Sequence, residues 1–139
     1  MTFLNDLKDG EDTEILFLEY LLGLDIIGWR NTSTTLQEKR LYDVVDKSGT
    51  TYELKTDRMW QRTGNIYVEE KTLKSSRADY IVYILKGDET FYVISRFGLL
   101  EILDYAKFKE VKGGDFKDKG YLIPIDDFKK LFNKGIYAN

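Results

Sequence analysis

Apolar and polar residues along the chain follow the short, alternating pattern that is typical of β-strands. The strand-like runs are Ile26–Trp29, Leu41–Val45, Thr51–Asp57, Ile66–Lys71, Tyr80–Leu85 and Phe91–Ser95. A further short run, Tyr121–Pro124, is expected at a sheet edge, because proline has no N–H to donate to a ladder. These runs predict a sheet whose first half is largely antiparallel.

Other segments have the spacing and end signals of helices. A first helix is expected from about Glu11 to Leu22, with Gly23 ending it. Gly98–Tyr105 and Asp126–Phe132 predict two more, the last with an aspartate as its N-cap. The order helix, strands, helix, strand, helix predicts a single mixed α+β or α/β domain over residues 1–139.

Composition limits the chemistry that such a domain can perform. The 139 residues include no His and no Cys, which excludes imidazole bases, thiol nucleophiles and thiolate zinc sites. A metal would have to be a hard ion held by oxygen ligands, such as Mg²⁺, Mn²⁺ or Ca²⁺. The 21 Lys and Arg against 24 Asp and Glu give a net charge of −3. This balance argues against coating nucleic acid by bulk charge, but it allows a local basic patch.

The sequence predicts a protein that does not enter a membrane. No apolar run approaches the roughly 18 residues that span a bilayer. The start of the chain, Met1–Asp6, lacks the basic and apolar regions of a signal peptide. An intracellular, cytoplasmic location is therefore expected.

Carboxylates fall at unexpected places in the predicted helix. On a helical wheel Glu14 lies within an apolar sector, with Glu11 beside it. The apolar members of that sector are Ile15, Phe17, Leu18, Leu21 and Leu22. A carboxylate facing a core is costly unless it is paired or bound to a metal. The alternative is that both acids stabilise the first helical turn through the helix dipole.

A predicted hairpin brings further charged residues together. Asp46-Lys47-Ser48-Gly49 has the composition of a tight turn. A loop of three or five residues would place Asp43 opposite Glu53. Because strand side chains alternate, Glu53 and Lys55 point to the same face. Two carboxylates at this spacing form an oxygen-ligand site for a divalent ion, and a lysine beside them can position water or stabilise negative charge.

The position of Glu53-Leu54-Lys55 in the chain distinguishes it from other tripeptides of the same pattern. The pattern acid-x-Lys occurs six times in the chain, but Glu53-Leu54-Lys55 follows a strand that carries its own acid across a tight turn. A solvent-exposed salt-bridge pair is the simpler alternative. A rival catalytic set would use Asp57, Glu69 and Lys71, without a tight hairpin to join its acids.

These residues resemble the PD-(D/E)xK nuclease superfamily. The match is Gly10-x-x-x-Glu14 on a first helix, then Asp43, then Glu53-Leu54-Lys55. Two further stretches, 63–69 and 75–80, resemble small phage-type members, and the layout is similar to that of Holliday-junction resolvases. The resemblance covers roughly residues 10 to 85. The sequence departs from the pattern at Tyr42, where the superfamily often has proline.

The resemblance implies a restriction-endonuclease-like core, with a central mixed sheet flanked by helices. It also implies Mg²⁺- or Mn²⁺-dependent cleavage of DNA by an endonuclease, with junctions or other special structures among its substrates. Asp43, Glu53 and Glu14 would bind metal, and Lys55 would complete the catalytic set. Cutting both strands would call for a homodimer, and a phage-encoded protein would act in the host cytoplasm.

Residues that follow the catalytic strand are candidates for contacts with DNA. The candidates are Arg58, Trp60, Arg62, Asn65, Lys71, Lys74 and Arg77. Arginine pairs with phosphates, and tryptophan stacks on an unpaired base. Trp60 could instead cover the hydrophobic core. The alternative function is a nucleic-acid-binding or protein-interaction module that performs no chemistry, in which the acids form a salt-bridge cluster.

Overall fold

The computed structural model describes residues 10–33, 35, 41–88, 90–106, 108–113 and 116–132. Its helices are α1 (Gly10–Gly23), α3 (Trp60–Thr63), α4 (Glu70–Ser75), α5 (Arg96–Ala106) and α6 (Ile125–Phe132). Its strands are β1 (Gly28–Arg30), β2 (Val44–Asp46), β3 (Thr51–Asp57), β4 (Asn65–Glu69), β5 (Tyr80–Leu85), β6 (Phe91–Ser95), β7 (Lys109–Gly113) and β8 (Phe116–Pro124). The predicted mixed α+β class is confirmed. No helix in these ranges is long and apolar enough to cross a membrane.

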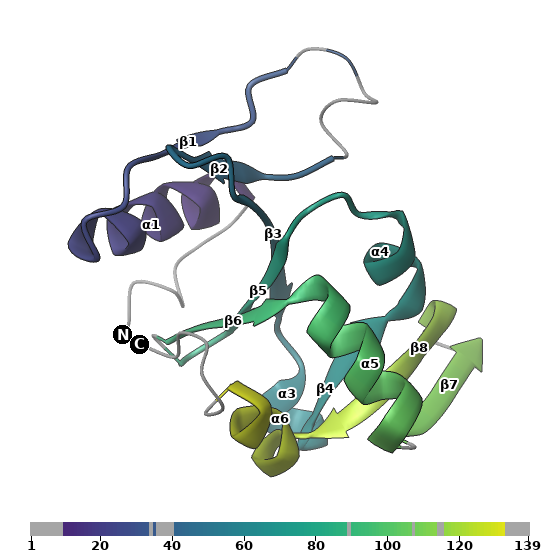
Figure 1. Cartoon of the computed structure of the whole chain (residues 1–139). Helices are drawn as coiled ribbons and strands as arrows, with labels where there is room; N and C mark the ends of the chain where they lie inside the picture. Colours follow the sequence, from purple (N-terminus) through teal and green to yellow (C-terminus); the bar gives the residue numbers. More distant parts are fainter. Residues whose placement is uncertain are drawn as a thin grey trace.

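The main sheet is mixed, with the strand order β1-β2-β3-β5-β6. Its first strands, β1 to β3, pair antiparallel, as the sequence predicts. β3 then pairs in parallel with β5, and β6 returns antiparallel. Figure 1 shows α1 on one side of this sheet and α5 on the other. The bounds of β3, β5 and β6 are those predicted, because each is a clear apolar or alternating run.

Helix α1 packs on one face of the main sheet. Phe17 and Leu21 are buried against Val82 and Ile84 of β5. The expectation that Ile15 and Leu22 also face the core is wrong, since they are 42% and 62% exposed. The buried stripe instead repeats every four residues through Thr13, Phe17 and Leu21, so residues on either side of it turn toward solvent.

The opposite face of the main sheet packs against a second sheet, with the order β4-β8-β7, and against α5 and α6. Alternate residues of β4 and β8 supply its core side chains, Ile66, Val68 and Ile123. Leu99 of α5 and Phe128 of α6 complete that core. The charged residues of β3 lie on this same face, so the second sheet borders them.

Two expectations about this second sheet are wrong. Tyr121–Pro124 belongs to β8, which lies between β4 and β7 rather than at an edge. Proline is tolerated because Pro124 is the last residue of the strand, where pairing ends. The strand predicted over Ile66–Lys71 ends at Glu69, and Lys71 lies in α4. Glu70 begins that helix and forms an ion pair with Lys74 one turn later, at 3.1 Å.

Candidate functional site

The turn between β2 and β3 fixes the register of the hairpin. Gly49 adopts φ +90°, which a residue with a Cβ rarely adopts. The Asp46 carboxylate fastens the turn. It accepts hydrogen bonds from the N–H groups of Ser48 (2.9 Å) and Thr50 (3.0 Å) and from the hydroxyl of Tyr52 (2.9 Å). Val44 is consequently paired with Tyr52, and the hairpin carries Asp43 toward Glu53.

Asp43 lies at the point where β2 leaves the regular ladder. Its backbone N–H still donates to the carbonyl of Tyr52, at 2.8 Å. The next N–H on β3, that of Leu54, donates to the Asp43 side chain at 2.7 Å. The Asp43 carboxylate therefore accepts the hydrogen bond that a backbone carbonyl of β2 would accept if the ladder continued. The structure holds it against β3, where it hydrogen-bonds with the carboxyl group of Glu53.

Glu53 is a half-buried acid with another acid beside it. Burial, the larger cause, and the neighbouring Asp43 charge together raise the pKa of Glu53 to about 7. The Lys55 ammonium and a hydrogen bond from the Ser76 hydroxyl oppose this rise. The nearby Asp43 carboxyl therefore favours the protonated form of Glu53. A divalent cation would neutralise the same pair without that proton.

Replacing Glu53 by glutamine should stabilise the metal-free protein at alkaline pH. A carboxyl whose pKa rises from 4.5 to about 7 on folding binds its proton more tightly in the folded chain, so stability falls as pH rises through this window. The glutamine side chain does not ionise, so the stability of the variant does not fall in this pH range. It should exceed the wild type by about 1–3 kcal/mol above pH 7 and match it below pH 4.5.

Urea unfolding in EDTA, at one pH below this window and one above it, measures the difference. The exposed Glu101 of α5 provides a matched control, Glu101→Gln, which should show no such pH dependence. Equal stability of wild type and Glu53→Gln on the alkaline side would contradict the described environment of Glu53.

Ser76 is a site residue that sequence reasoning missed. Its side chain is buried, and its Oγ accepts the N–H of Ala78 at 3.1 Å while the hydroxyl hydrogen-bonds with Glu53. Arg96 holds this segment in place by donating to the carbonyls of Ala78 (2.9 Å) and Leu73 (3.0 Å). The available signal was a serine two residues before Ala78, a spacing that favours a local side-chain turn.

Tyr83 of β5 is buried and is the register partner of Lys55 on β3. Burial raises the pKa of the Tyr83 hydroxyl, and the carboxylates of Asp57, Glu69 and Glu53 raise it further. These acids come from β3 and from β4. The hydroxyl therefore marks the place where the main sheet and the second sheet bring their acidic residues near one another.

Glu14 is not joined to the Asp43 and Glu53 pair. Its carboxylate forms an ion pair with Arg30 of β1, at 3.1 Å. Arg30 is paired with Val44, whose side chain is buried on the α1 side of the sheet. In the part of the chain that the structure describes, no group of three or more acidic side chains lies close enough to hold a metal. The side chain of Glu11 lies outside the described part.

The rival set of Asp57, Glu69 and Lys71 is arranged differently. Asp57 accepts the N–H of Met59 at 2.9 Å and that of Tyr67 at 3.2 Å, so it fastens α3 and β4 to the end of β3. Lys71 is exposed on α4, whereas Glu69 belongs to β4. Glu69 and Lys71 therefore do not lie on one strand, as the predicted run Ile66–Lys71 would require.

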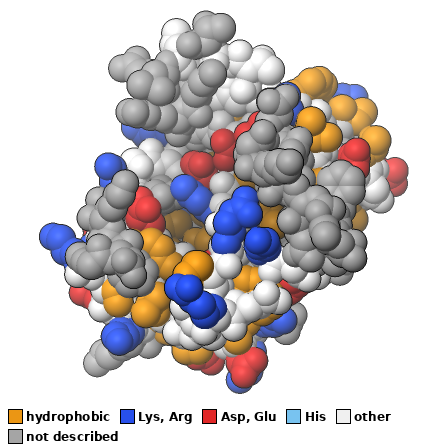
Figure 2. Space-filling model, turned by 180° about the vertical axis from the view of Figure 1, so that it is seen from behind, with side chains coloured by type: hydrophobic (Ala, Val, Ile, Leu, Met, Phe, Trp, Pro, Cys, Tyr) orange, Lys and Arg blue, Asp and Glu red, His pale blue; other side chains and the backbone are white. Residues whose placement is uncertain are grey.

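The residues predicted to contact DNA differ in how far their side chains are exposed. Arg58, Arg62, Lys71 and Arg77 are exposed, and Lys74 is exposed while paired with Glu70. Asn65 donates to the carbonyl of Thr63 at 3.2 Å. Trp60 donates from its indole N–H to the carbonyl of Lys86 at 2.8 Å and packs on the core. Figure 2 shows acidic and basic side chains adjoining at the centre of the rear face.

Comparison with known proteins gives a structural likeness. No protein-family model and no curated protein sequence matches the chain. A similar solved structure is that of D212, a nuclease from a fusselovirus, with a TM-score of 0.55 and 12% identity. The likeness covers 91% of this chain and 92% of that one. At this identity it shows that the two chains share a fold.

Proposed function

We propose that the protein is a metal-dependent nuclease of the PD-(D/E)xK type, acting on DNA. The observation that carries this proposal is the contact between the carboxyl groups of Asp43 and Glu53, with Lys55 on the same face of β3. The order of elements supports it, since the antiparallel strands β1–β3 and the parallel strand β5 form the sheet that carries the site, and α1 packs on the opposite face of that sheet. The shared fold with a viral nuclease is consistent with it.

The residues present fit a hard divalent cation. Asp43 and Glu53 offer carboxylate oxygens, and like charge between them is relieved only by a proton or a cation. Mg²⁺ binds through one or two carboxylates and keeps water and phosphate oxygens as its other ligands. When bound, Mg²⁺ or Mn²⁺ would lower the pKa of a coordinated water and offset phosphate charge.

Side chains of the protein would supply the other functions that catalysis requires. Asp43 and Glu53 would hold the cation, and the Ser76 hydroxyl would orient Glu53. The Lys55 ammonium would orient the attacking water and stabilise the negative charge that develops on the phosphate. In-line attack of that water on phosphorus breaks the bond to the 3′ oxygen. The products are a 5′-phosphate and a 3′-hydroxyl.

A digest panel tests this function. The purified protein would be incubated with labelled single-stranded, duplex, flap and four-way-junction DNA, and with RNA, in Mg²⁺ or Mn²⁺. Cleavage of at least one DNA form, abolished by EDTA, is expected. Binding to the panel without cleavage would favour the non-catalytic module, and cleavage that persists in EDTA would contradict a metal site.

Removing the Ser76 hydroxyl should weaken catalysis without abolishing it. Ser76→Ala leaves a Glu53 oxygen without its hydrogen bond, and loss of such a supporting contact costs about 10- to 100-fold in metal affinity or rate. Ser76→Thr should retain most activity, since it keeps a hydroxyl. Ser75→Ala is the matched control, because the Ser75 hydroxyl donates to the Lys71 carbonyl instead. Metal titration of the cleavage rate makes the comparison, and equal behaviour of the two alanine variants would exclude this role.

A further inference from the structure

Trp29 of β1 is a largely exposed aromatic residue on the main sheet. It is 53% exposed. Among the residues that the structure describes, it packs with neither hydrophobic core and contacts no other aromatic ring. The chain has one other tryptophan, Trp60, which packs on the core and donates its indole N–H to the carbonyl of Lys86. Trp29 is therefore the tryptophan whose ring is available to a ligand.

Trp29 points away from helix α1. A Cβ built on the preceding Gly28 would lie 3.2 Å from a side-chain carbon of Leu18 and 3.5 Å from one of Leu21, so position 28 faces α1. Because side chains alternate along a strand, position 29 faces the other side of the main sheet.

The carboxylate pair of the proposed site lies on this same face. Trp29 is paired with Val45 of β2, and Val45 is paired with Thr51 of β3, so the three side chains share one face of the sheet. Glu53 follows Thr51 by two residues and therefore points the same way. Asp43 contacts Glu53 there. The exposed indole and the proposed metal ligands thus belong to one surface.

The separation of Trp29 from Asp43 corresponds to one or two nucleotides. The backbone N–H of Asn31 donates to the carbonyl of Asp43 at 2.9 Å, so Asn31 lies opposite Asp43. Trp29 precedes Asn31 by two residues, which is about 6.5 Å along β1. Successive nucleotides of a stacked strand rise by about 3.4 Å. A base that lies on Trp29 would therefore belong to a nucleotide close to a phosphate held at Asp43.

A basic side chain also borders the carboxylate pair. Arg77 follows Ser76, whose hydroxyl hydrogen-bonds with Glu53, and the Arg77 N–H donates to the carbonyl of Leu41 at 3.3 Å. Leu41 precedes Asp43 by two residues, so the backbone of Arg77 lies close to both acids. Arg77 is exposed and forms no ion pair within the described ranges. Its guanidinium is available to a phosphate.

This face also carries negative charge. Besides Asp43 and Glu53, it borders the exposed Asp79, whose carboxylate accepts the N–H of Thr51 at 3.0 Å and its hydroxyl at 3.2 Å. Binding of nucleic acid here therefore cannot depend on bulk positive charge. An aromatic contact, which needs no net charge, would have to supply much of the affinity.

From this arrangement we infer that Trp29 is a stacking site for an unpaired base next to the cleaved bond, with Arg77 holding a neighbouring phosphate. The inference rests on the proposed nuclease function and specifies its substrate, which is DNA that exposes unpaired nucleotides where it is cut. Bases inside a duplex already stack on both neighbours, whereas an unpaired base has a face open to the indole. Such stacking tolerates any base.

Binding without cleavage tests this inference. Fluorescence anisotropy in EDTA would follow fluorescein-labelled single-stranded DNA of about 12 nucleotides, with its duplex as a separate arm. Trp29→Leu should weaken single-strand binding by about 5- to 100-fold, whereas Trp29→Tyr keeps an aromatic ring and should lose less. Leu22→Ala is the matched control, because it removes an exposed apolar side chain from the end of α1 and should bind as the wild type does.

The emission of Trp29 gives a second, direct signal. Trp60→Phe leaves Trp29 as the only tryptophan, and unlabelled single-stranded DNA should then quench the emission. Trp29→Tyr leaves only Trp60, which packs on the core and should show no comparable quenching.

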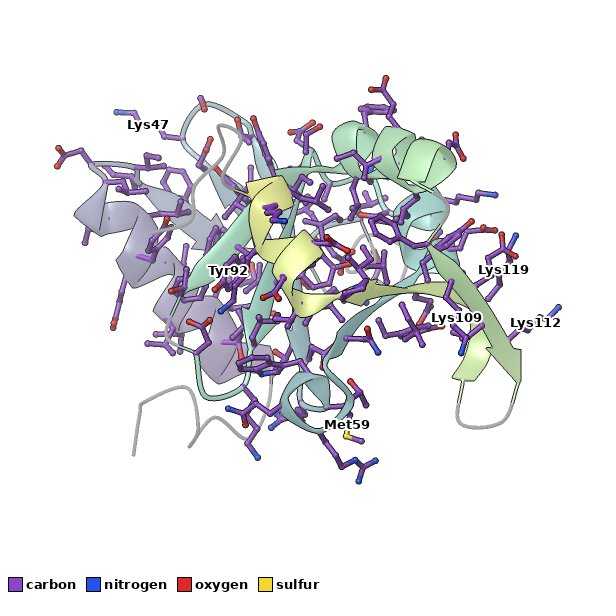
Figure 3. All side chains as sticks on the ribbon, turned by 90° about the horizontal axis from the view of Figure 1, so that it is seen from below. Lys47, Met59, Tyr92, Lys109, Lys112 and Lys119 are labelled. Carbon is purple, nitrogen blue, oxygen red and sulfur yellow. The ribbon has the colours of Figure 1, made fainter. Side chains whose placement is uncertain are left out.

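The phosphate contact of Arg77 is measured by the salt dependence of binding. Arg77→Ala should lower the slope of log affinity against log salt by about one. Lys112→Ala should leave this slope unchanged. Figure 3 shows Lys112 on the β7–β8 ribbon, on the opposite side of the molecule from Lys47 in the turn between β2 and β3.

The outcomes separate this inference from the proposed function. Weaker single-strand binding by Trp29→Leu, together with quenching of Trp29, supports the stacking site even if the protein cleaves nothing. Unchanged affinity in a folded Trp29→Leu variant, or a wild type that binds no single strand or prefers duplex, overturns the inference even if the protein is an active nuclease. A wild-type dimer that Trp29→Leu converts to a monomer in sedimentation would assign Trp29 to contact with a second copy, and would also overturn it.

Discussion

Replacing Lys55 by methionine is expected to reduce metal-dependent DNA cleavage by at least about 10²- to 10³-fold. The methionine retains the apolar stem of the lysine, so packing against Tyr83 and the neighbouring strand is largely kept. What the variant lacks is the ammonium group that faces Glu53. A positioned charge is worth most in a partly buried site, where water screens it little.

The Lys55→Met experiment needs a control and a second measurement. Lys47→Met changes an exposed lysine in the adjacent hairpin turn and should leave the cleavage rate unaltered. Metal binding to Lys55→Met should persist, since the carboxylates remain. Full activity of Lys55→Met would refute the catalytic assignment and would direct attention to the exposed Lys71 of α4.

Replacing Asp43 by asparagine is expected to abolish the stabilisation of the protein by divalent metal. For the wild type, a metal concentration of about 100 times its dissociation constant should add about 2.7 kcal/mol, which raises the unfolding temperature by about 5–10 °C. Asparagine offers one neutral oxygen in place of a carboxylate. It can still accept the N–H of Leu54, so the turn of the chain at this position should survive.

Thermal unfolding with increasing Mn²⁺ measures this effect. In EDTA, Asp43→Asn should unfold at or above the temperature of the wild type, because the substitution removes the charge that raises the pKa of Glu53. Asp25→Asn is a suitable control, since Asp25 is exposed and has φ +63°, a conformation that asparagine also accepts. A wild-type protein whose stability ignores Mn²⁺, or an Asp43→Asn variant that responds equally, would contradict the metal site.

The parts of the fold that were predictable are those in which local pattern and tertiary packing agree. β3, β5 and β6 are continuous apolar or alternating runs, and they pair in the middle of the main sheet. The hairpin that brings Asp43 to Glu53 is set by a short turn whose residues are visible in the sequence. For this reason the pair is predictable from the amino-acid sequence alone.

The features that the sequence alone does not reveal depend on contacts between distant segments. Nothing near Pro124 reveals that β7 pairs with β8 and leaves Pro124 at the end of an interior strand. Glu14 lies on the expected helix, but its pairing with Arg30 follows from how α1 packs on β1. The approach of Ser76 to Glu53 likewise requires the parallel pairing of β3 with β5.

The dependence of DNA cleavage on Mg²⁺ concentration tests the central claim most directly. The substrate would be whichever DNA form the wild-type protein cuts best, and the rate would be followed from EDTA through saturating metal. The account predicts no cleavage in EDTA, a saturable rise with Mg²⁺, and 5′-phosphate ends on the products. Cleavage that needs no metal, or a protein that binds Mg²⁺ at Asp43 and Glu53 yet cuts no nucleic acid, would contradict it.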